Sequence, residues 1–379
     1  MHYFLADNSV LKWIETPSLY QIRTDELYEL DDASFEFLKK CASEDGGQSK
    51  DMEFVDYCLA EGLLTTKEVS SKQPPLIKSP VPSLRYLELQ ITDQCNLRCR
   101  HCYIREKPPQ KLSVAQITDI LLEFEEMQGL RVMITGGEPL LHSDFDALND
   151  LLPDFSIRKV LFTNGLLLNK SLLGRLNVDE IQISIDGLEK AHDALRGKGT
   201  FNKAVLAVRL AKEQGFEVSV ATMVHAKNLG DFDEMEKLFA GLEIRDWTVD
   251  VPCITGQLEI NSEFQIPPEV GGKYLRYGHG AGLHAGATGF GCGLHLLSAM
   301  ADGKVTKCTF YADQPIGSIN DGLRQCWERT VPITLKDLAC DCEYLETCRG
   351  GCRYRAELLG DTNGKDLYKC FLYDILNNN

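Results

Sequence analysis

The feature that most limits the fold of this chain is a series of six apolar, strand-like runs that alternate with amphipathic, helix-like windows. The runs are residues 86–92, 131–135, 159–163, 180–185, 217–224 and 247–251, and the helical windows begin near Ser113, Ser143, Lys170, Phe201 and Asp231. Because each helical crossover returns the chain to the same direction, the alternation predicts a parallel sheet of the α/β class. Six units rather than eight predict an open, partial (β/α)6 barrel.

The chain contains 14 cysteines among 379 residues. Its first residues lack a basic segment followed by an apolar core, and its apolar runs are much shorter than the ~18 residues of a membrane span. We therefore expect a cytoplasmic protein without membrane contact, in which thiols stay reduced and bunched cysteines hold metal or perform redox chemistry. The net charge of −16 argues against nucleic acid, which requires a concentrated basic surface.

Composition divides the chain into regions. Residues 1–68 contain two extended stretches (20–23 and 27–30) and two helices (33–41 and 51–61), which predicts a small α+β domain. Residues 69–84 are rich in Pro and Ser and predict a stiff linker. The partial barrel is expected over 85–252, a bridging segment over 253–285 and a Cys-rich domain over 286–379.

Cys95, Cys99 and Cys102 follow the first barrel strand in a C-x3-C-x2-C spacing. Three thiolates on one tight loop can hold three irons of a [4Fe-4S] cube and leave the fourth iron open to another ligand. Zinc takes four ligands, usually from paired C-x2-C units, so this spacing fits zinc poorly. The loop predicts an iron–sulfur site.

The segment TDQCNLRCRHCY resembles the signature of radical S-adenosyl-L-methionine (SAM) enzymes, whose other motifs follow in order at successive strand ends. They are Gly136-Gly137-Glu138-Pro139, Thr163-Asn164-Gly165 and Ser184-Ile185-Asp186-Gly187. The resemblance covers roughly residues 85–250 and implies a partial TIM-type barrel. It also implies that a reduced [4Fe-4S] cluster cleaves SAM to methionine and a 5'-deoxyadenosyl radical, which abstracts hydrogen from the substrate.

The same resemblance implies a SAM site at these strand ends, where glycines would let the backbone approach closely. The expected contacts are Tyr103, Gly136, Gly137, Glu138, Pro139, Asn164, Ser184, Asp186 and Arg196. Glu138 would supply charge to the SAM amine, and the guanidinium of Arg196 would pair with the carboxylate. In the alternative interpretation, Asn164 and Asp186 only shape turns and Arg196 is a solvated surface residue.

The later cysteines resemble the SPASM extension of radical SAM enzymes, which binds up to two auxiliary [4Fe-4S] clusters. By this resemblance, Cys292, Cys308 and Cys352 would hold the first cluster. The second would be held by Cys340, Cys342, Cys348 and Cys370, although the family usually has C-x2-C where one residue separates Cys340 from Cys342.

The first auxiliary cluster lacks an obvious fourth ligand. Cys253, after the sixth strand, is one candidate and His284 a weaker one; otherwise the site is open for a substrate thiolate or another exogenous group. Because 38 residues separate Cys253 from Cys292, we favour the open site, so that Cys253→Ala would leave the iron content unchanged. The remaining cysteines, Cys41, Cys58 and Cys326, are expected to be packed thiols.

The first 64 residues carry 14 acidic and 5 basic side chains, a net charge of −9. This region resembles the small winged-helix domains that recognise leader peptides of ribosomally made peptides; the alternative is a generic accessory domain. Asp32 is expected to cap the helix that begins at Ala33. A leader peptide would add as a strand to a sheet edge, and the charge would favour a basic leader whose binding weakens with salt.

Together, these resemblances imply a SPASM-type radical SAM oxidoreductase, a peptide maturase that forms a thioether, a carbon–carbon crosslink or a related side-chain modification. Its partners would be a peptide or small protein substrate and an electron donor such as flavodoxin or ferredoxin. Asp250 and Cys253 are candidate catalytic residues. The alternatives are maturation of a tetrapyrrole- or pterin-type cofactor, formylglycine formation on a sulfatase, and an Fe–S electron-transfer or scaffold protein without SAM chemistry.

Overall fold

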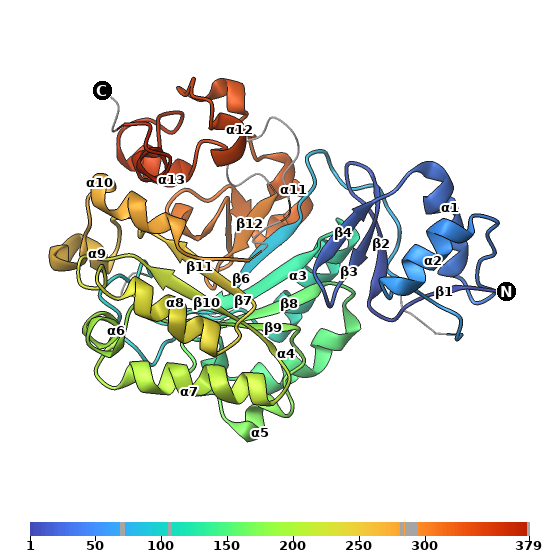
Figure 1. The fold of residues 1–379 in the computed structure, drawn as a ribbon, viewed down its shortest axis with the longest axis horizontal. Helices are drawn as coiled ribbons and strands as arrows, with labels where there is room; N and C mark the ends of the chain where they lie inside the picture. Colours follow the sequence, from blue (N-terminus) through green and yellow to red (C-terminus); the bar gives the residue numbers. More distant parts are fainter. Residues whose placement is uncertain (69–72, 105–107, 281–283, 285–294, 377–379) are drawn as a thin grey trace.

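The computed structural model describes residues 1–68, 73–104, 108–280, 284 and 295–376. Its central sheet contains β6 (Tyr86–Thr92), β7 (Arg131–Gly136), β8 (Arg158–Thr163), β9 (Glu180–Ser184), β10 (Glu217–Met223), β11 (Asp246–Asp250), β12 (Leu296–Ala299), β13 (Lys304–Thr306) and β14 (Gly317–Ser318). The order is β11-β10-β9-β8-β7-β6-β12-β13-β14 (Figure 1). Strands β6 to β11 pair in parallel, so the predicted partial barrel is confirmed.

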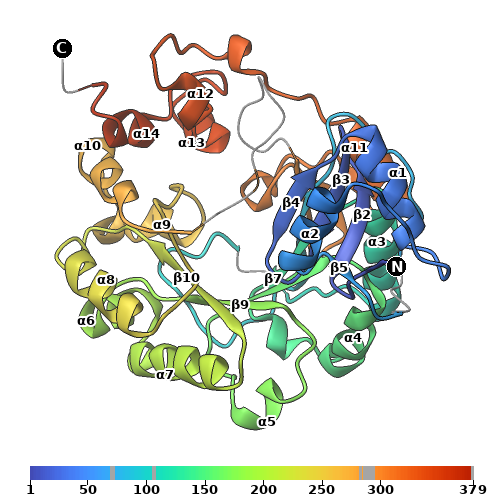
Figure 2. The same ribbon diagram turned by 45° about the vertical axis from the view of Figure 1, so that its right-hand side comes forward.

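Helices connect these strands and cover the outer face of the curved sheet (Figure 2). They are α3 (Val114–Glu126), α4 (Phe145–Leu151), α5 (Lys170–Leu173), α6 (Glu189–Arg196), α7 (Thr200–Glu213) and α8 (Phe232–Gly241). Helix α3 begins where predicted because Ser113 and Gln116 form a reciprocal capping box.

The two faces of the barrel sheet differ in character. On β6, Leu87, Leu89 and Ile91 point outward into the main apolar core beneath the helices. The alternate residues point inward, as the two-residue period of a strand requires. The inner face carries polar side chains such as Glu88 and Gln90 and a separate small apolar cluster that includes Tyr86, Met133 and Val160. The inner face of the sheet is therefore partly polar, in contrast to the apolar outer face.

Part of the C-terminal region packs at the carboxyl ends of the barrel strands, whereas its helix Leu323–Glu328 packs against α3. Its helices are α9 (Gln257–Ile260), α10 (Pro268–Gly271), α11 (Leu323–Glu328), α12 (Leu345–Cys348), α13 (Arg353–Leu358) and α14 (Leu367–Leu372). Arg355 of α13 donates to Asp250 at the end of β11 (2.8 Å). Across the described part of the chain, no helix has both the length and the apolar character needed to cross a bilayer.

The N-terminal unit, residues 1–68, contains β1 (Phe4–Leu5), β2 (Ser9–Trp13), β3 (Pro17–Gln21), β4 (Glu26–Glu29), β5 (Leu64–Thr65), α1 (Asp32–Cys41) and α2 (Met52–Ala60). Strands β2, β3 and β4 form an antiparallel sheet, and β1 pairs with β5. The two predicted extended stretches correspond to β3 and β4 with shifted boundaries, whereas β1, β2 and β5 were not predicted. Cys41 and Cys58 lie in the apolar core of this unit, as expected.

The predicted cap of α1 is wrong by one residue. Asp31, not Asp32, is the N-cap: its backbone is extended, and its side chain accepts a hydrogen bond from the amide of Ser34 (2.7 Å). An N-cap carboxylate reaches the amide three residues ahead, whereas Asp32 already has helical geometry as the first residue of α1. The hydrogen bond from Ser34 lowers the pKa of Asp31.

The described part of the predicted linker packs along the seam between the N-terminal unit and the barrel. The amide of Ser79 donates to the carbonyl of Trp13 (2.8 Å), and that of Ser83 donates to Glu15 (2.7 Å). From the barrel side, the Gln128 side chain donates to the carbonyl of Pro75 (3.0 Å). These contacts fix the path of the segment between the two parts.

Candidate active site and metal centre

The cysteine loop, residues 93–104, follows β6 at the carboxyl end of the barrel. Cys95, Cys99 and Cys102 are all partly buried, and their thiols are close enough to interact electrostatically. Backbone hydrogen bonds fix the loop on two sides: the amide of Arg100 donates to Leu195 on α6 (2.9 Å), and that of Gln257 donates to Cys102 (2.9 Å). Burial raises the pKa of Cys99 to about 11, so these thiols need a metal or a cation to become thiolates.

Gly136 and Gly137 are required by the approach of β7 to the cysteine loop. Gly136 has φ +144°, and a Cβ there would lie 2.0 Å from the carbonyl oxygen of Thr92. A Cβ on Gly137 would lie 2.4 Å from the carbonyl oxygen of Gln94. The close backbone approach expected toward SAM is thus seen toward the chain's own loop.

Glu138 is buried and ties three strand ends together. Its carboxylate accepts hydrogen bonds from the Thr163 hydroxyl (2.8 Å) and the Asn164 amide (2.9 Å), while its own amide donates to Gln94 in the cysteine loop (2.8 Å). Burial raises the pKa of Glu138 to about 7, although these hydrogen bonds act to lower it. The sequence motif therefore marks a buried carboxyl group directly behind the loop.

Asp186 and Arg196 form a buried ion pair beside the cysteine loop. Asp186 also accepts from the amide of Met223 (2.7 Å), and Arg196 interacts electrostatically with Cys99 and Cys102. The pKa of Asp186 is lowered well below its usual range, because Arg196 outweighs the opposing effect of burial. Arg196 is therefore not the solvated surface residue of the alternative interpretation.

Two histidines that the sequence analysis did not single out hold the backbone of Asp186. Its amide donates to His192 Nδ1 (3.0 Å), and its carbonyl accepts from His225 Nε2 (2.9 Å). Both rings are buried, which lowers their pKa. No sequence motif marks either histidine. His192 lies on the helix that follows Asp186, and His225 follows the next strand, β10.

The remaining predicted SAM contacts surround the loop. Asn164 donates from its side chain to Asn96 within the loop (2.8 Å), and buried Pro139 begins a 3-10 turn over Pro139–Leu141. The Tyr103 hydroxyl accepts from Gln90 (3.2 Å). Ser184 is the partly buried last residue of β9. All the predicted contacts therefore lie on the loop, at the strand ends or, for Arg196, at the end of α6.

Glu88 is a further candidate functional residue on the inner face of the barrel, and the sequence analysis did not single it out. It lies on the inner face of β6, where its carboxylate accepts from the Ser298 hydroxyl and from the amide of Thr309 (3.0 Å). Burial raises its pKa. The alternation in YLELQIT, with Glu88 and Gln90 two residues apart in an apolar strand, is the signal that could have revealed a polar inner face.

Cys253 is buried, and its thiol is hydrogen-bonded to that of Cys352. This contact joins the end of β11 to the start of α13, and the pKa of Cys253 is raised by it and by burial. Cys308 lies in the same neighbourhood, because both Cys308 and Cys352 interact electrostatically with Tyr311. Cys292 lies outside the described residues. Asp250, the other catalytic candidate, is held by Arg355.

The four cysteines of the second predicted group also come together. Cys340 interacts electrostatically with Cys342 and Cys348, and Cys370 interacts with Cys340 and Cys348. Cys326 is a buried thiol that contacts the carbonyl of Ser318 (3.6 Å), as expected of a packing residue.

Within the described ranges, no three Cys, His, Asp or Glu side chains are gathered tightly enough to bind one metal ion. A [4Fe-4S] cube instead distributes its thiolate ligands over different iron atoms. Three neighbouring but separate thiols on one loop fit such a cube better than a single-ion site.

Residues 89–239 match the family model of the Radical SAM superfamily. The chain is 34% identical over 194 residues to a putative glycyl-radical enzyme activating enzyme of Methanocaldococcus jannaschii, a match that covers 49% of this chain and 73% of that protein. The chain belongs to the radical SAM superfamily. This radical SAM chain is also 35% identical over 161 residues to mycofactocin maturase MftC of Mycolicibacterium smegmatis, with 41% of each chain covered. It thus spans about two fifths of the length of that curated relative.

The fold is similar to that of Streptococcus suis SuiB, solved in complex with the precursor peptide SuiA. The TM-score is 0.68 at 14% sequence identity, and the match covers 97% of this chain and 100% of the SuiB chain. The protein anSMEcpe, solved with AdoMet and a Cp18Cys peptide, gives a TM-score of 0.57 at 20% identity over 76% of this chain and 94% of that chain. At these identities the likeness concerns the fold.

Proposed function

We propose that this protein is a radical SAM enzyme that modifies a ribosomally synthesised peptide or protein, forming a thioether, a carbon–carbon crosslink or a related side-chain modification. The observation that carries the proposal is the loop of Cys95, Cys99 and Cys102, fixed at the carboxyl end of the barrel by the glycines and Glu138. Support for a peptide substrate comes from MftC, a maturase, and from the fold shared with SuiB, which was solved with a precursor peptide.

Bound at the cysteine loop, a [4Fe-4S] cluster and SAM would supply reductive cleavage of SAM to methionine and a 5'-deoxyadenosyl radical that takes hydrogen from the substrate. The side chains of the protein position the cysteine loop and the groups bound to it. Glu138 and Asn164 link the ends of β7 and β8 to the loop, and Arg196 places positive charge beside the thiols. The expected SAM contacts remain those of the loop and strand ends described above.

The test is to reduce the iron-loaded protein with SAM in the absence of oxygen and to measure 5'-deoxyadenosine. Wild type and Cys326→Ala, which removes a packed thiol, are expected to form it, whereas Cys99→Ala is not. Peptides encoded beside the gene are then added and their masses followed. An iron-loaded wild type without 5'-deoxyadenosine would contradict SAM chemistry; 5'-deoxyadenosine with no mass change in any such peptide would favour cofactor maturation instead.

We also infer that the C-terminal region is of the SPASM type and binds two auxiliary [4Fe-4S] clusters, with Cys253 completing the first. The sequence favoured an open site, but the hydrogen-bonded contact between Cys253 and Cys352 supports ligation by Cys253. His284 is a poor candidate because its ring bonds to Tyr86 at the start of β6 (2.8 Å), whereas Cys253 follows the end of β11.

Iron and sulfide content decides between ligation by Cys253 and the open site. Cys253→Ala is expected to lose about one cluster per chain relative to Cys326→Ala, with a matching loss in the electron paramagnetic resonance spectrum of the reduced protein. Unchanged iron in Cys253→Ala would restore the open site, while unchanged iron in Cys352→Ala would contradict the auxiliary cluster itself.

For the N-terminal unit we propose leader-peptide recognition. Strand β4 is the terminal strand of its sheet and is largely exposed, so a peptide can add along it as a further strand. We assign the electron donor to the flavodoxin or ferredoxin type and the protein to the cytoplasm, where its thiols stay reduced.

A further inference from the structure

Five neighbouring barrel strands begin with a charged residue. They are Arg131 on β7, Arg158 on β8, Glu180 on β9, Glu217 on β10 and Asp246 on β11. The register places Arg131 beside Arg158 and Glu180 beside Glu217. Because the strands are parallel, these residues form one charged rim at the amino-terminal mouth of the barrel, at the opposite end from the cysteine loop.

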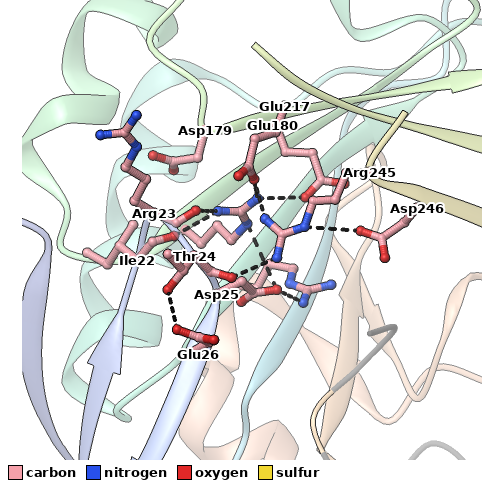
Figure 3. A network of polar contacts seen from close by, with 12 residues as sticks. Ile22, Arg23, Thr24, Asp25, Glu26, Asp179, Glu180, Glu217, Arg245 and Asp246 are labelled. Carbon is pink, nitrogen blue, oxygen red and sulfur yellow. Dashed lines mark hydrogen bonds and ion pairs between the residues drawn. The ribbon is translucent and has the colours of Figure 1, made fainter. Parts of the chain in front are cut away.

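The turn of residues 22–25, between β3 and β4 of the N-terminal unit, lies against this charged rim (Figure 3). Turns between strands normally lie in solvent. Here Arg23 and Thr24 at the tip of the turn are exposed, but Ile22 and Asp25 on either side are only 6% and 8% exposed. Ile22 and Tyr20 share a small apolar cluster with Leu130, the residue before β7. The two ends of the turn are therefore packed against the base of the barrel, and its tip faces solvent.

Arg158 makes the central contacts with the turn. Its side chain is fully buried, and it donates to the carbonyls of Ile22 (2.8 Å) and Arg23 (2.7 Å). It also pairs with Glu180 (2.8 Å) and with Glu217. A buried guanidinium needs acceptors for its donors, and the turn supplies two of them. The Nε of Arg158 has no hydrogen-bond partner among the described residues and lies 4.0 Å from the Asp25 carboxylate.

Further contacts surround Asp25. Its carboxylate pairs with Arg131 and accepts from the Tyr20 hydroxyl (2.5 Å), and its carbonyl accepts from His284 (2.7 Å). At the edge of the network, Arg245 donates to the carbonyl of Thr24 (2.7 Å). Asp25 adopts a left-handed conformation, φ +62°, which is uncommon for a residue other than glycine and which these contacts hold in place.

We propose that the N-terminal unit has a second function besides peptide recognition: the turn of residues 22–25 closes the amino-terminal mouth of the barrel. Reactants would then not enter the barrel through this mouth. The inner-face residues nearest to the closed mouth include Tyr86 and Met133, which are 2% and 6% exposed.

Hydroxyl-radical footprinting of the full chain tests the closure, with oxidation of Met133 as the readout. Asp25→Ala removes the carboxylate that pairs with Arg131, and Arg245→Gln is a milder change at the edge of the network. Both are expected to raise the oxidation of Met133 severalfold, as local opening exposes buried groups without global unfolding. Met235, which is fully buried in the main core, serves as the internal reference and should not change.

Glu26→Gln is the matched control. Glu26 follows the turn directly, but among the described residues its carboxylate accepts from the Thr24 and Tyr28 side chains on the hairpin surface and from no group of the barrel, so Met133 should stay protected. Closure by the turn is overturned if Met133 stays protected in both test variants, or if Met235 is oxidised in step with it in both. Peptide binding by the N-terminal unit does not enter this readout, so its failure would be seen separately.

Discussion

At the scale of single residues, Gly136 occupies a position that leaves no room for a side chain. A Cβ on Gly136 would lie 2.0 Å from the carbonyl oxygen of Thr92, a backbone atom that cannot rotate away, and φ +144° is unfavourable for any residue with a Cβ. We predict that Gly136→Ala lowers the free energy of unfolding by about 2 kcal/mol or more and reduces iron bound at the cysteine loop. Gly241→Ala in α8, where a Cβ would meet open space, is the control for denaturant unfolding and iron analysis; equal behaviour of the two variants would contradict the steric argument.

Glu138 should make stability depend on pH. Its pKa is raised by burial from the usual 4.5 to about 7, so the folded state retains a proton that the unfolded chain releases. The resulting stabilisation is complete below pH 4.5 and is lost as the pH rises through 7, a change on the order of 3 kcal/mol. Urea unfolding of the iron-free protein across this range should show the loss in wild type and in the exposed control Glu61→Gln. Glu138→Gln should lack it; a parallel pH profile would rule out Glu138 as the titrating group.

The site residues that belong to short sequence motifs could be predicted. Those whose role depends on a contact with a residue far away in the sequence could not. The three cysteines and the two glycines lie in short, ordered motifs. The link between Asn164 and Asn96 crosses 68 positions, and no local pattern announces such a contact. For the same reason, the 38 residues between Cys253 and Cys292 favoured an open site, although the fold brings Cys253 to Cys352.

At the scale of elements, the barrel strands were predicted because each is a long apolar run between helical windows. Strands β1 and β5 contain two residues each, too few for any periodicity to appear. Strand β12 was also missed, since its place in the sheet is set by pairing with β6 across more than 200 positions. Short elements that depend on tertiary pairing therefore account for most of the error.

The corrected cap of α1 gives a prediction at this scale. Asp31→Ala should lower the free energy of unfolding by about 1 kcal/mol, because it removes the acceptor for the Ser34 amide. Asp32→Ala, which changes the charge equally but leaves that hydrogen bond, should cost less. Chemical denaturation of both variants provides the comparison, and a greater loss in Asp32→Ala would restore the original assignment of the cap.

At the scale of the whole molecule, the sequence predicted separate regions but could not predict the contacts between them. The charges that begin β7 to β11 are visible in the sequence, yet their role depends on a turn more than 100 residues away. The acidic character of the N-terminal unit is a global property that the sequence did reveal, with a net charge of −9 over 64 residues.

This charge yields a prediction for the proposed leader peptide. A basic peptide should bind the full chain less tightly when salt is raised from about 0.05 to about 0.5 M, because exposed charges are then screened. Fluorescence anisotropy with labelled peptide measures the change. Glu29→Gln on exposed β4 should weaken binding at low salt, whereas Glu236→Gln on α8 should not. Tight, salt-insensitive binding of an acidic peptide would contradict this view of the surface.

The pairing of β12 with β6 has a practical consequence for anyone who shortens this protein. A fragment that stops after the last barrel helix would leave the backbone donors and acceptors along one side of β6 without their partner strand. An exposed edge strand of this kind pairs readily with the same strand of another molecule. Expression of the barrel on its own should therefore give aggregates, and a usable fragment must keep the residues through β14.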